Sequence, residues 1–211
     1  MPTLKFVFPE TCRSKVQQFG VTTDGEDWLY LGGDVSKGYR VYCQGMASSE
    51  PKTYLKLLNT SANVSNPGYN YSSLHYAASD GSTGVITRTF TGLLVEPRTD
   101  SGTHYLEVIA GQSSYTDWAG VPVRTGGDQL LLAQSLNVLE AQGQGGAQAS
   151  ANLNLEGTPF MLASSLAIQG DGTATGLRWP VSADRKIIDL SVIAGTAGAN
   201  KMIRLDWAAA K

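Results

Sequence analysis

A stretch of 23 residues occurs twice in this chain, and no other feature constrains the fold as strongly. Residues 89–111 align without a gap on residues 173–195, and ten of the 23 positions are identical. The identities include the whole run Val-Ile-Ala-Gly, at residues 108–111 and 192–195. Because two unrelated short strands seldom agree at so many positions, we interpret the pair as an internal repeat.

Weaker matches extend both copies. Each copy ends in the tripeptide Asp-Trp-Ala, which begins at Asp117 in the first and at Asp206 in the second. The alternative interpretation is that glycine-rich β-sequences align easily, and the ungapped block argues against it. The predicted organisation therefore has three parts: an N-terminal arm at residues 1–21, a first domain at residues 22–120 and a second domain at residues 121–211.

Short strand-like runs separated by turn residues follow one another along both copies. They are expected at residues 28–31, 39–43, 53–58, 85–95 and 104–110, and again at 129–132, 136–141, 151–155, 160–168, 175–179, 186–193 and 201–207. Residues 130–141 also fit a short helix. The spacing predicts an all-β fold of two tandem, related antiparallel β-sandwich domains. The alternation of Leu4, Phe6 and Phe8 predicts one more strand in the arm, paired with its own sheet or with a partner.

Charge is scarce in this chain, and this scarcity excludes some functions. Charged residues make up 16% of the sequence, the formal net charge is −2, and lysine and arginine form no cluster. Binding to nucleic acid by neutralising phosphates is therefore not expected. No apolar run is long enough to cross a bilayer, and the N-terminus lacks the features of a secretory signal. We expect a cytoplasmic origin and a weakly charged surface that is partly covered in an assembly.

Cys12 and Cys43 are the only cysteines. A bridge between them is one alternative, and two reduced, packed thiols are the other. For a protein made in the cytosol the second alternative is favoured, and we predict reduced thiols. The spacing of cysteine and histidine suggests no metal site, and no cofactor is expected.

The two copies differ most between residues 60 and 89. Matching residues of the two copies are 98 positions apart before this segment and 84 positions apart after it, so the first copy carries 14 extra residues. All nine tyrosines lie in the first copy. Tyrosine, serine, asparagine and glycine are typical of recognition loops, so we predict a ligand-binding loop containing Tyr69, Asn70, Tyr71 and Tyr76. The alternative is that these tyrosines pack on their own domain. Because loop shortening changes closure entropy slowly, deletion of residues 63–72 is expected to leave stability nearly unchanged.

No catalytic constellation stands out. His75 and His104 are the only histidines, and Ser72 or Ser73 near His75 lacks the sequence context of a nucleophile elbow. A turn with solvated carboxylates is favoured over a calcium site for the acidic cluster, whose members are Asp24, Glu26, Asp27 and Asp34. We therefore predict a protein that is not an enzyme.

In composition and expected architecture the chain resembles bacteriophage virion components, in particular tail, baseplate, fibre and capsid decoration proteins. These proteins often contain β-domains rich in glycine, alanine, threonine and asparagine. The resemblance implies a structural or attachment protein that is incorporated into a virion and contacts copies of itself, other virion proteins, and a host glycan or receptor. The alternative function is a free carbohydrate-binding protein of two β-sandwich domains.

Overall fold

The computed structural model describes residues 7–58, 70–77, 83–89, 91–109, 140–143, 148–171, 173–199 and 203–208. Almost all of the regular structure is β-strand, so the prediction of an all-β protein is confirmed. Within the described residues, no helix is long and apolar enough to span a membrane.

The first sheet has seven strands, and all of its pairs are antiparallel. Its order is β1 (Gly25–Tyr30), β2 (Gly38–Gln44), β3 (Lys52–Lys56), β6 (Gly92–Asp100), β7 (Thr103–Val108), β14 (Ile203–Trp207) and β10 (Phe160–Leu162). The ring of Tyr39 on β2 meets the ring of Phe160 on β10 edge-on, with centroids 5.2 Å apart. Because these strands lie near opposite ends of the sheet, the sheet curls back on itself.

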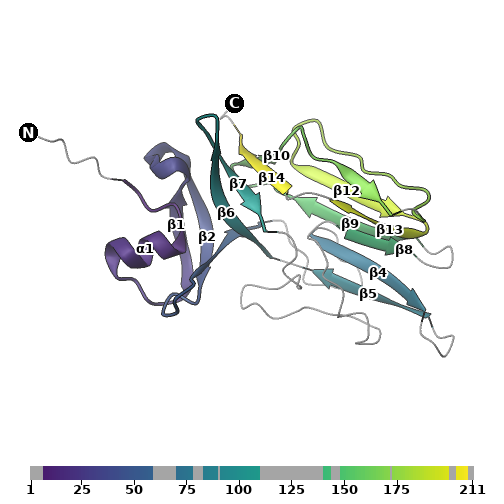
Figure 1. Cartoon of the computed structure of the whole chain (residues 1–211), viewed down its shortest axis with the longest axis horizontal. Coiled ribbons are helices and arrows are strands. Elements are labelled where there is room, and N and C mark those ends of the chain that lie inside the picture. The colour runs from purple at the N-terminus through teal and green to yellow at the C-terminus, as the bar shows by residue number, and fades with distance from the viewer. Residues whose placement is uncertain are drawn as a thin grey trace, which may run out of the picture.

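The second sheet lies beside the first (Figure 1). Its order is β11 (Ile168–Gly170), β13 (Gly195–Ala199), β8 (Glu140–Gly143), β4 (Tyr71–Ala77), β9 (Ala149–Asn154) and β12 (Ile187–Val192), with β5 (Thr83–Thr89) paired to β4. Its one parallel contact among the described strands joins Leu74 of β4 to Gln142 of β8. Buried side chains from both sheets form one hydrophobic core.

The strands of the two predicted domains are mixed between the sheets. β10 and β14 join the first sheet, although they lie in residues 121–211, and β4 and β5 join the second sheet, although they lie in residues 22–120. The arrangement as two tandem sandwiches is therefore not confirmed. The predicted boundary, between residues 120 and 121, lies outside the described residues, and the division there stays a prediction.

Both copies of the repeated block form a hairpin, but the hairpins sit differently in their sheets. In the first copy, β6 pairs with β7 and β3 lies beside β6. In the second copy, residues 175–181 pair with β12 through three bridges, and β9 lies beside β12. β12 corresponds to β7 and not to β6, so the two copies differ in strand order, although related domains would be expected to share one. Sequence similarity preserved the local hairpin, whereas the choice of neighbour depends on long-range packing.

Most of the predicted strands are found within a few residues of their expected ends. The predicted strand at 85–95 is two strands, β5 and β6, which lie in different sheets, and the strand at 160–168 is likewise divided into β10 and β11. Leu4, Phe6 and residues 129–132 lie outside the described residues. Residues 7–9 form no strand, although the Pro9 carbonyl accepts a hydrogen bond from Tyr30 N at 3.0 Å.

A short helix, α1 (Cys12–Phe19), covers the start of the first sheet, and it was not predicted. A capping box begins it: Ser14 N donates to Thr11 Oγ1 at 2.9 Å, and Thr11 N donates to Ser14 Oγ at 3.0 Å. Gly20 ends the helix in the left-handed conformation. Two short 3₁₀ turns, Leu31–Gly33 and Val35–Lys37, follow β1.

Cys12 and Cys43 form a disulfide that joins α1 to β2, with their Cα atoms 5.5 Å apart. The prediction of two reduced thiols is therefore wrong. Cys12 N also donates a buried hydrogen bond to Thr53 Oγ1 at 3.0 Å, so the first turn of α1 is held to both β2 and β3. A short polar helix gains its stability from these long-range links, since its own sequence provides few apolar contacts.

Candidate functional site

An open trough of about 560 Å³ runs along β1, the first strand of the first sheet. Residues of α1 and of the chain just before and after it complete the lining. We call this hollow the aromatic trough, and its lining residues are Phe8, Pro9, Lys15, Phe19, Val21, Asp27, Trp28 and Tyr30.

Two of these aromatic side chains are half exposed. Trp28 is 52% exposed and Phe19 is 49% exposed, whereas Leu29 between Trp28 and Tyr30 is fully buried. The alternation along β1 therefore sends Leu29 into the core and Trp28 outward. Gly38 on β2 gives the rings room, because a Cβ atom there would lie 3.5 Å from Trp28 Cε3 and 3.3 Å from Tyr30 Cε1.

An ion pair links the two walls of the aromatic trough. The ammonium group of Lys15 on α1 contacts the carboxylate of Asp27 on β1. The same carboxylate accepts a hydrogen bond from Trp28 N at 2.8 Å. This pair gives the lining of the hollow one strong donor and one strong acceptor in addition to its aromatic rings.

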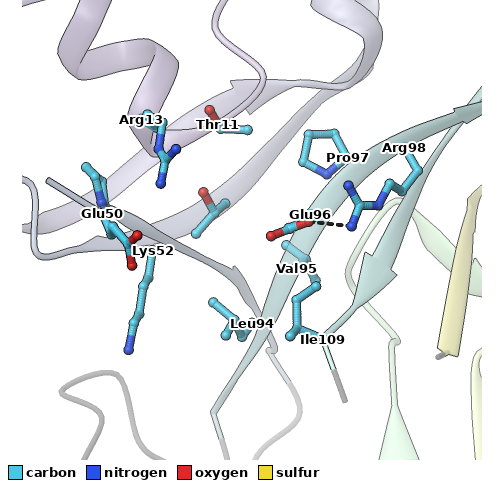
Figure 2. A pocket seen from close by; sticks show the side chains of 12 residues that line it. Thr11, Arg13, Glu50, Lys52, Leu94, Val95, Glu96, Pro97, Arg98 and Ile109 are labelled. Carbon is cyan, nitrogen blue, oxygen red and sulfur yellow. Dashed lines mark ion pairs between the residues drawn. The ribbon is translucent and has the colours of Figure 1, made fainter. Parts of the chain in front are cut away.

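A second hollow, of about 420 Å³, opens between β3 and β6 (Figure 2). The two strands are paired over only three residues, from Tyr54 opposite Leu94 to Lys56 opposite Gly92. Beyond that point they diverge, and the first turn of α1 lies at the open end. We call this hollow the splayed cleft, and its lining residues are Thr11, Arg13, Glu50, Pro51, Lys52, Thr53, Leu94, Val95, Glu96, Pro97, Arg98 and Ile109.

The charges of the splayed cleft are only partly paired. Arg98 contacts Glu96 at 2.6 Å and Glu107 at 2.7 Å, and its pKa is raised chiefly by the hydrogen bond to Glu107. Arg13 and Glu96 point into the cleft from opposite sides in Figure 2. Within the described part of the chain, neither Arg13 nor Lys52 forms an ion pair.

The predicted recognition loop is only partly described. Tyr69 lies outside the described residues, and so does the side chain of Tyr76, whose backbone belongs to β4. Asn70 is fully buried, and Asn154 N donates to its Oδ1 at 2.8 Å. The Tyr71 hydroxyl forms a hydrogen bond with Ser150 Oγ at 3.0 Å. Asn70 therefore joins β4 to β9, and it is not placed at the surface for a ligand. Ligand binding by the loop stays a prediction.

The four carboxylates of the acidic cluster are engaged by four different sets of partners. Asp24 accepts hydrogen bonds from Gly45 N and Met46 N, at 2.9 and 2.7 Å. Glu26 pairs with Arg40 and Lys56, Asp27 pairs with Lys15, and Asp34 accepts from Ser36. In the described residues no three His, Cys, Asp or Glu side chains gather to hold a metal ion.

The described histidine side chain has a structural position. His104 Nδ1 lies 2.9 Å from Thr99 Oγ1, across the β6–β7 hairpin. His75 belongs to β4, and its side chain lies outside the described part.

Sequence reasoning missed Phe19 and Trp28 as candidate binding residues. The available signal was the position of Trp28 next to Leu29 in a predicted strand, because alternation sends these two side chains to opposite faces.

A family model described as the GON domain matches residues 9–83. The chain is similar to that domain over α1 and β1 to β4, a range that contains both cysteines and most of the aromatic trough. No match to a curated protein is found for the chain.

Proposed function

We propose that this chain is a non-enzymatic attachment protein and that it binds carbohydrate through the aromatic trough. The proposal is carried by one observation: the half-exposed rings of Phe19 and Trp28 and the Lys15–Asp27 ion pair line the same open hollow. Phe19 is the last residue of α1 and Trp28 lies on β1, and together their half-exposed rings give one hollow an apolar surface of the kind that marks ligand-binding sites.

The chemistry of the aromatic trough matches that of a sugar ring. One face of a sugar carries polarised C–H groups, which are attracted to the negative face of an aromatic ring. The rim carries hydroxyl groups, and an ion-paired lysine and aspartate can donate to and accept from adjacent hydroxyls without being desolvated alone. A protein partner would require a larger complementary surface than this trough provides.

The test is binding of the purified chain to a glycan array, followed by calorimetry on any glycan that is retained. We expect Trp28→Ala to weaken binding at least about tenfold, since a few aromatic anchors dominate most interfaces. Trp179→Ala is the matched control, because Trp179 is 44% exposed and lies outside the aromatic trough. An array without retained glycans, or equal losses for both variants, would contradict the proposal.

The virion role that the composition suggests is compatible with carbohydrate binding, and it also stays a proposal. A particle-bound attachment protein and a free carbohydrate-binding protein would both use the aromatic trough. Light scattering distinguishes them, because the virion role requires a homo-oligomer or a complex with particle proteins without any glycan. A disulfide is compatible with either role, since disulfides persist on secreted proteins and on virion surfaces.

A further inference from the structure

We infer that residues 177–181, which we call the edge segment, pair with the same residues of a second copy of this chain about a two-fold axis. The segment is joined by isolated bridges to β12, the last strand in the order of the second sheet. α1 and β1 lie at the other end of the molecule (Figure 1). The inference therefore concerns a surface other than the aromatic trough and does not depend on carbohydrate binding.

The first half of the edge segment turns one side of its backbone away from β12. Arg178 N donates to Ser191 O at 2.9 Å, and Ser191 N donates to Arg178 O at 2.8 Å. The N–H and C=O groups of one trans peptide point in opposite directions. The peptides on either side of Arg178 therefore direct Leu177 O and Trp179 N away from β12.

The second half does the same, and its proline leaves the outer side intact. Asp189 N donates to Pro180 O at 3.1 Å, and Ser182 N donates to Ile187 O at 2.9 Å. Val181 N and Val181 O therefore both point away from β12. Proline often protects a sheet edge by removing an outward donor, but the missing N–H of Pro180 belongs to the side that faces β12.

The groups on this outer side are unpaired. Alternation along an extended chain also places Trp179 O there. In the part of the chain that the structure describes, the backbone groups of Leu177, Trp179 and Val181 take part in no hydrogen bond. A sheet edge with free donors and acceptors is a template for another strand.

The side chains of the edge segment continue the core face of the second sheet. Val181 lies opposite Ile188 in an antiparallel bridge, and residues paired in this way point to the same face. Ile188 is fully buried, whereas Val181 is 42% exposed and Trp179 is 44% exposed, because the sheet ends there. A further strand beside the edge segment would cover both of these apolar side chains.

The edge segment is complementary to itself. A two-fold axis at Trp179 places this residue opposite the partner subunit's Trp179, and it places Val181 opposite the partner subunit's Leu177. In this register Trp179 N donates to the carbonyl of the partner subunit's Trp179, Val181 N donates to that of the partner subunit's Leu177, and symmetry repeats both bonds. Tryptophan then meets tryptophan and valine meets leucine, and apolar cross-strand pairs of this kind stabilise sheets.

Charge supports the same register. Arg178 is exposed and forms no ion pair among the described residues. Asp189 is exposed on the same face, two residues from Ser191, which is the bridge partner of Arg178. In the dimer Arg178 lies opposite the partner subunit's Pro180, and the partner subunit's Asp189 lies one strand further on. Two strand spacings, about 10 Å, separate these two backbones, so the arginine and aspartate side chains can meet.

Sedimentation velocity of the whole chain, from about 10 µM to about 1 mM, tests the pairing. Because the contact is short, we expect a reversible dimer at the weak end of specific interfaces. Trp179→Ala should weaken the dimer at least about tenfold, since it removes the central pair of side chains. Trp28→Ala is the matched control, because Trp28 is 52% exposed and lies outside the edge segment, and it should leave the dimer unchanged. A strict monomer over the whole range would overturn the inference.

Charge reversal on the two sides of the axis tests the register. Arg178→Glu and Asp189→Lys should each weaken the homodimer about fivefold, because each brings like charges together. An equal mixture of the two variants should form a heterodimer about as tight as the wild-type dimer, since one ion pair is retained and the other is reversed. Thermal unfolding checks that both variants fold. A mixture that associates no better than the separate variants would contradict the register.

Amide hydrogen exchange by NMR locates the contact. Raising the protein concentration through the dimerisation range should slow exchange at Trp179 N and Val181 N at least about fivefold. Arg178 N, which is already bonded to Ser191 O, should change much less. A dimer in which the amides of Trp179 and Val181 gain no protection would use another surface, and the inference would then be wrong.

Discussion

Asn70 and Asn154 exchange hydrogen bonds between the first residue before β4 and the last residue of β9. Asn154 N donates to Asn70 Oδ1 at 2.8 Å, and Asn70 Nδ2 donates to Asn154 O at 3.3 Å. Both side chains are fully buried, and Asn70 N also donates to Asn152 Oδ1 at 3.0 Å. This exchange fixes the start of β4 against β9, because a buried amide strongly prefers to keep its partners.

We predict that Asn70→Ala destabilises the protein by about 2–4 kcal/mol. The substitution leaves the backbone N–H of Asn154 unpaired and places a less tolerant residue at a φ of 57°. Urea unfolding measures the difference. Ser101→Gly is the control for the positive φ alone, because Ser101 has a φ of 47° in an exposed turn, and it should leave stability unchanged or slightly raised. An unchanged midpoint for Asn70→Ala would contradict this role.

The hydrogen bonds between Asn70 and Asn154 also change what we expect from deleting residues 63–72. Deletion of residues 63–72 removes Asn70 and the first two residues of β4, Tyr71 and Ser72. We now expect the deletion to lower the thermal midpoint, whereas deletion of residues 63–68 alone should leave it nearly unchanged. Thermal unfolding of the two deletion variants distinguishes these outcomes. Equal midpoints for the longer deletion and the wild type would restore the original expectation.

Reduction of the Cys12–Cys43 bridge is expected to destabilise the protein by about 3–4 kcal/mol, the chain-entropy value for a loop of this length. The two cysteines are 31 positions apart in the sequence. Thermal unfolding with and without a phosphine reductant provides the measurement. The control is the double variant Cys12→Ala/Cys43→Ala, which should be less stable and insensitive to reductant. If reductant lowers the midpoint of both proteins alike, the effect does not come from this bridge.

Glu26 should give a small, pH-dependent contribution to stability. Arg40 Nη2 donates to Glu26 Oε2 at 2.6 Å, and the pKa of Glu26 is lowered chiefly by the hydrogen bond from Lys56. A pKa that is lower in the folded state stabilises the fold above the unfolded value of about 4.3, and this contribution disappears as pH falls through the folded value.

The corresponding variant is Glu26→Gln. At pH 7 and low salt it should cost about 0.5 kcal/mol, because the carboxylate is exposed and screened by solvent. Urea unfolding at pH 7 and at pH 3 should give a difference only at the higher pH, and 1 M salt should reduce it. A difference of equal size at both pH values would mean that the ion pair is not its cause.

Local patterns in the sequence were sufficient to predict most strands. β2 is an example, because Val41 and Cys43 face the core while Arg40 and Tyr42 do not, and this alternation requires no knowledge of neighbours. α1 has no such pattern, and its position depends on the bridge to Cys43 and on Thr53, both distant in sequence. The pairing of strands was not predictable for the same reason, since β7 and β12 belong to the repeated block and yet pair with different neighbours.

Composition indicated recognition in the tyrosine-rich copy but not the residues that form the hollows. The hollow that Phe19 and Trp28 line depends on where α1 is held against the first sheet, which the sequence does not encode locally. The splayed cleft lies where the pairing of β3 with β6 ends, at Tyr54 and Leu94, which are distant in sequence. Such a coincidence between distant residues becomes visible only when the pairing is known.

The repeated Val-Ile-Ala-Gly run ends, in the second copy, in a glycine that the fold requires. Gly195 has a φ of 79°, and a Cβ atom there would lie 2.5 Å from the backbone nitrogen of Ala174. Gly102 has a φ of 80° and no atom within 4 Å of the same position. The two glycines therefore share a backbone conformation and differ in the space beside it.

Alanine substitution at the two glycines therefore separates the cost of the left-handed backbone conformation from the cost of a steric clash. Gly102→Ala should cost about 1–2 kcal/mol, the cost of a left-handed conformation for a residue with a Cβ atom. Gly195→Ala should cost clearly more, about 3 kcal/mol or above, because backbone atoms near Ala174 must also move. Urea unfolding of the two variants measures both effects on one scale. Equal costs would show that the chain around Ala174 adjusts freely, and the glycine at this end of the repeat would then be required only for its φ.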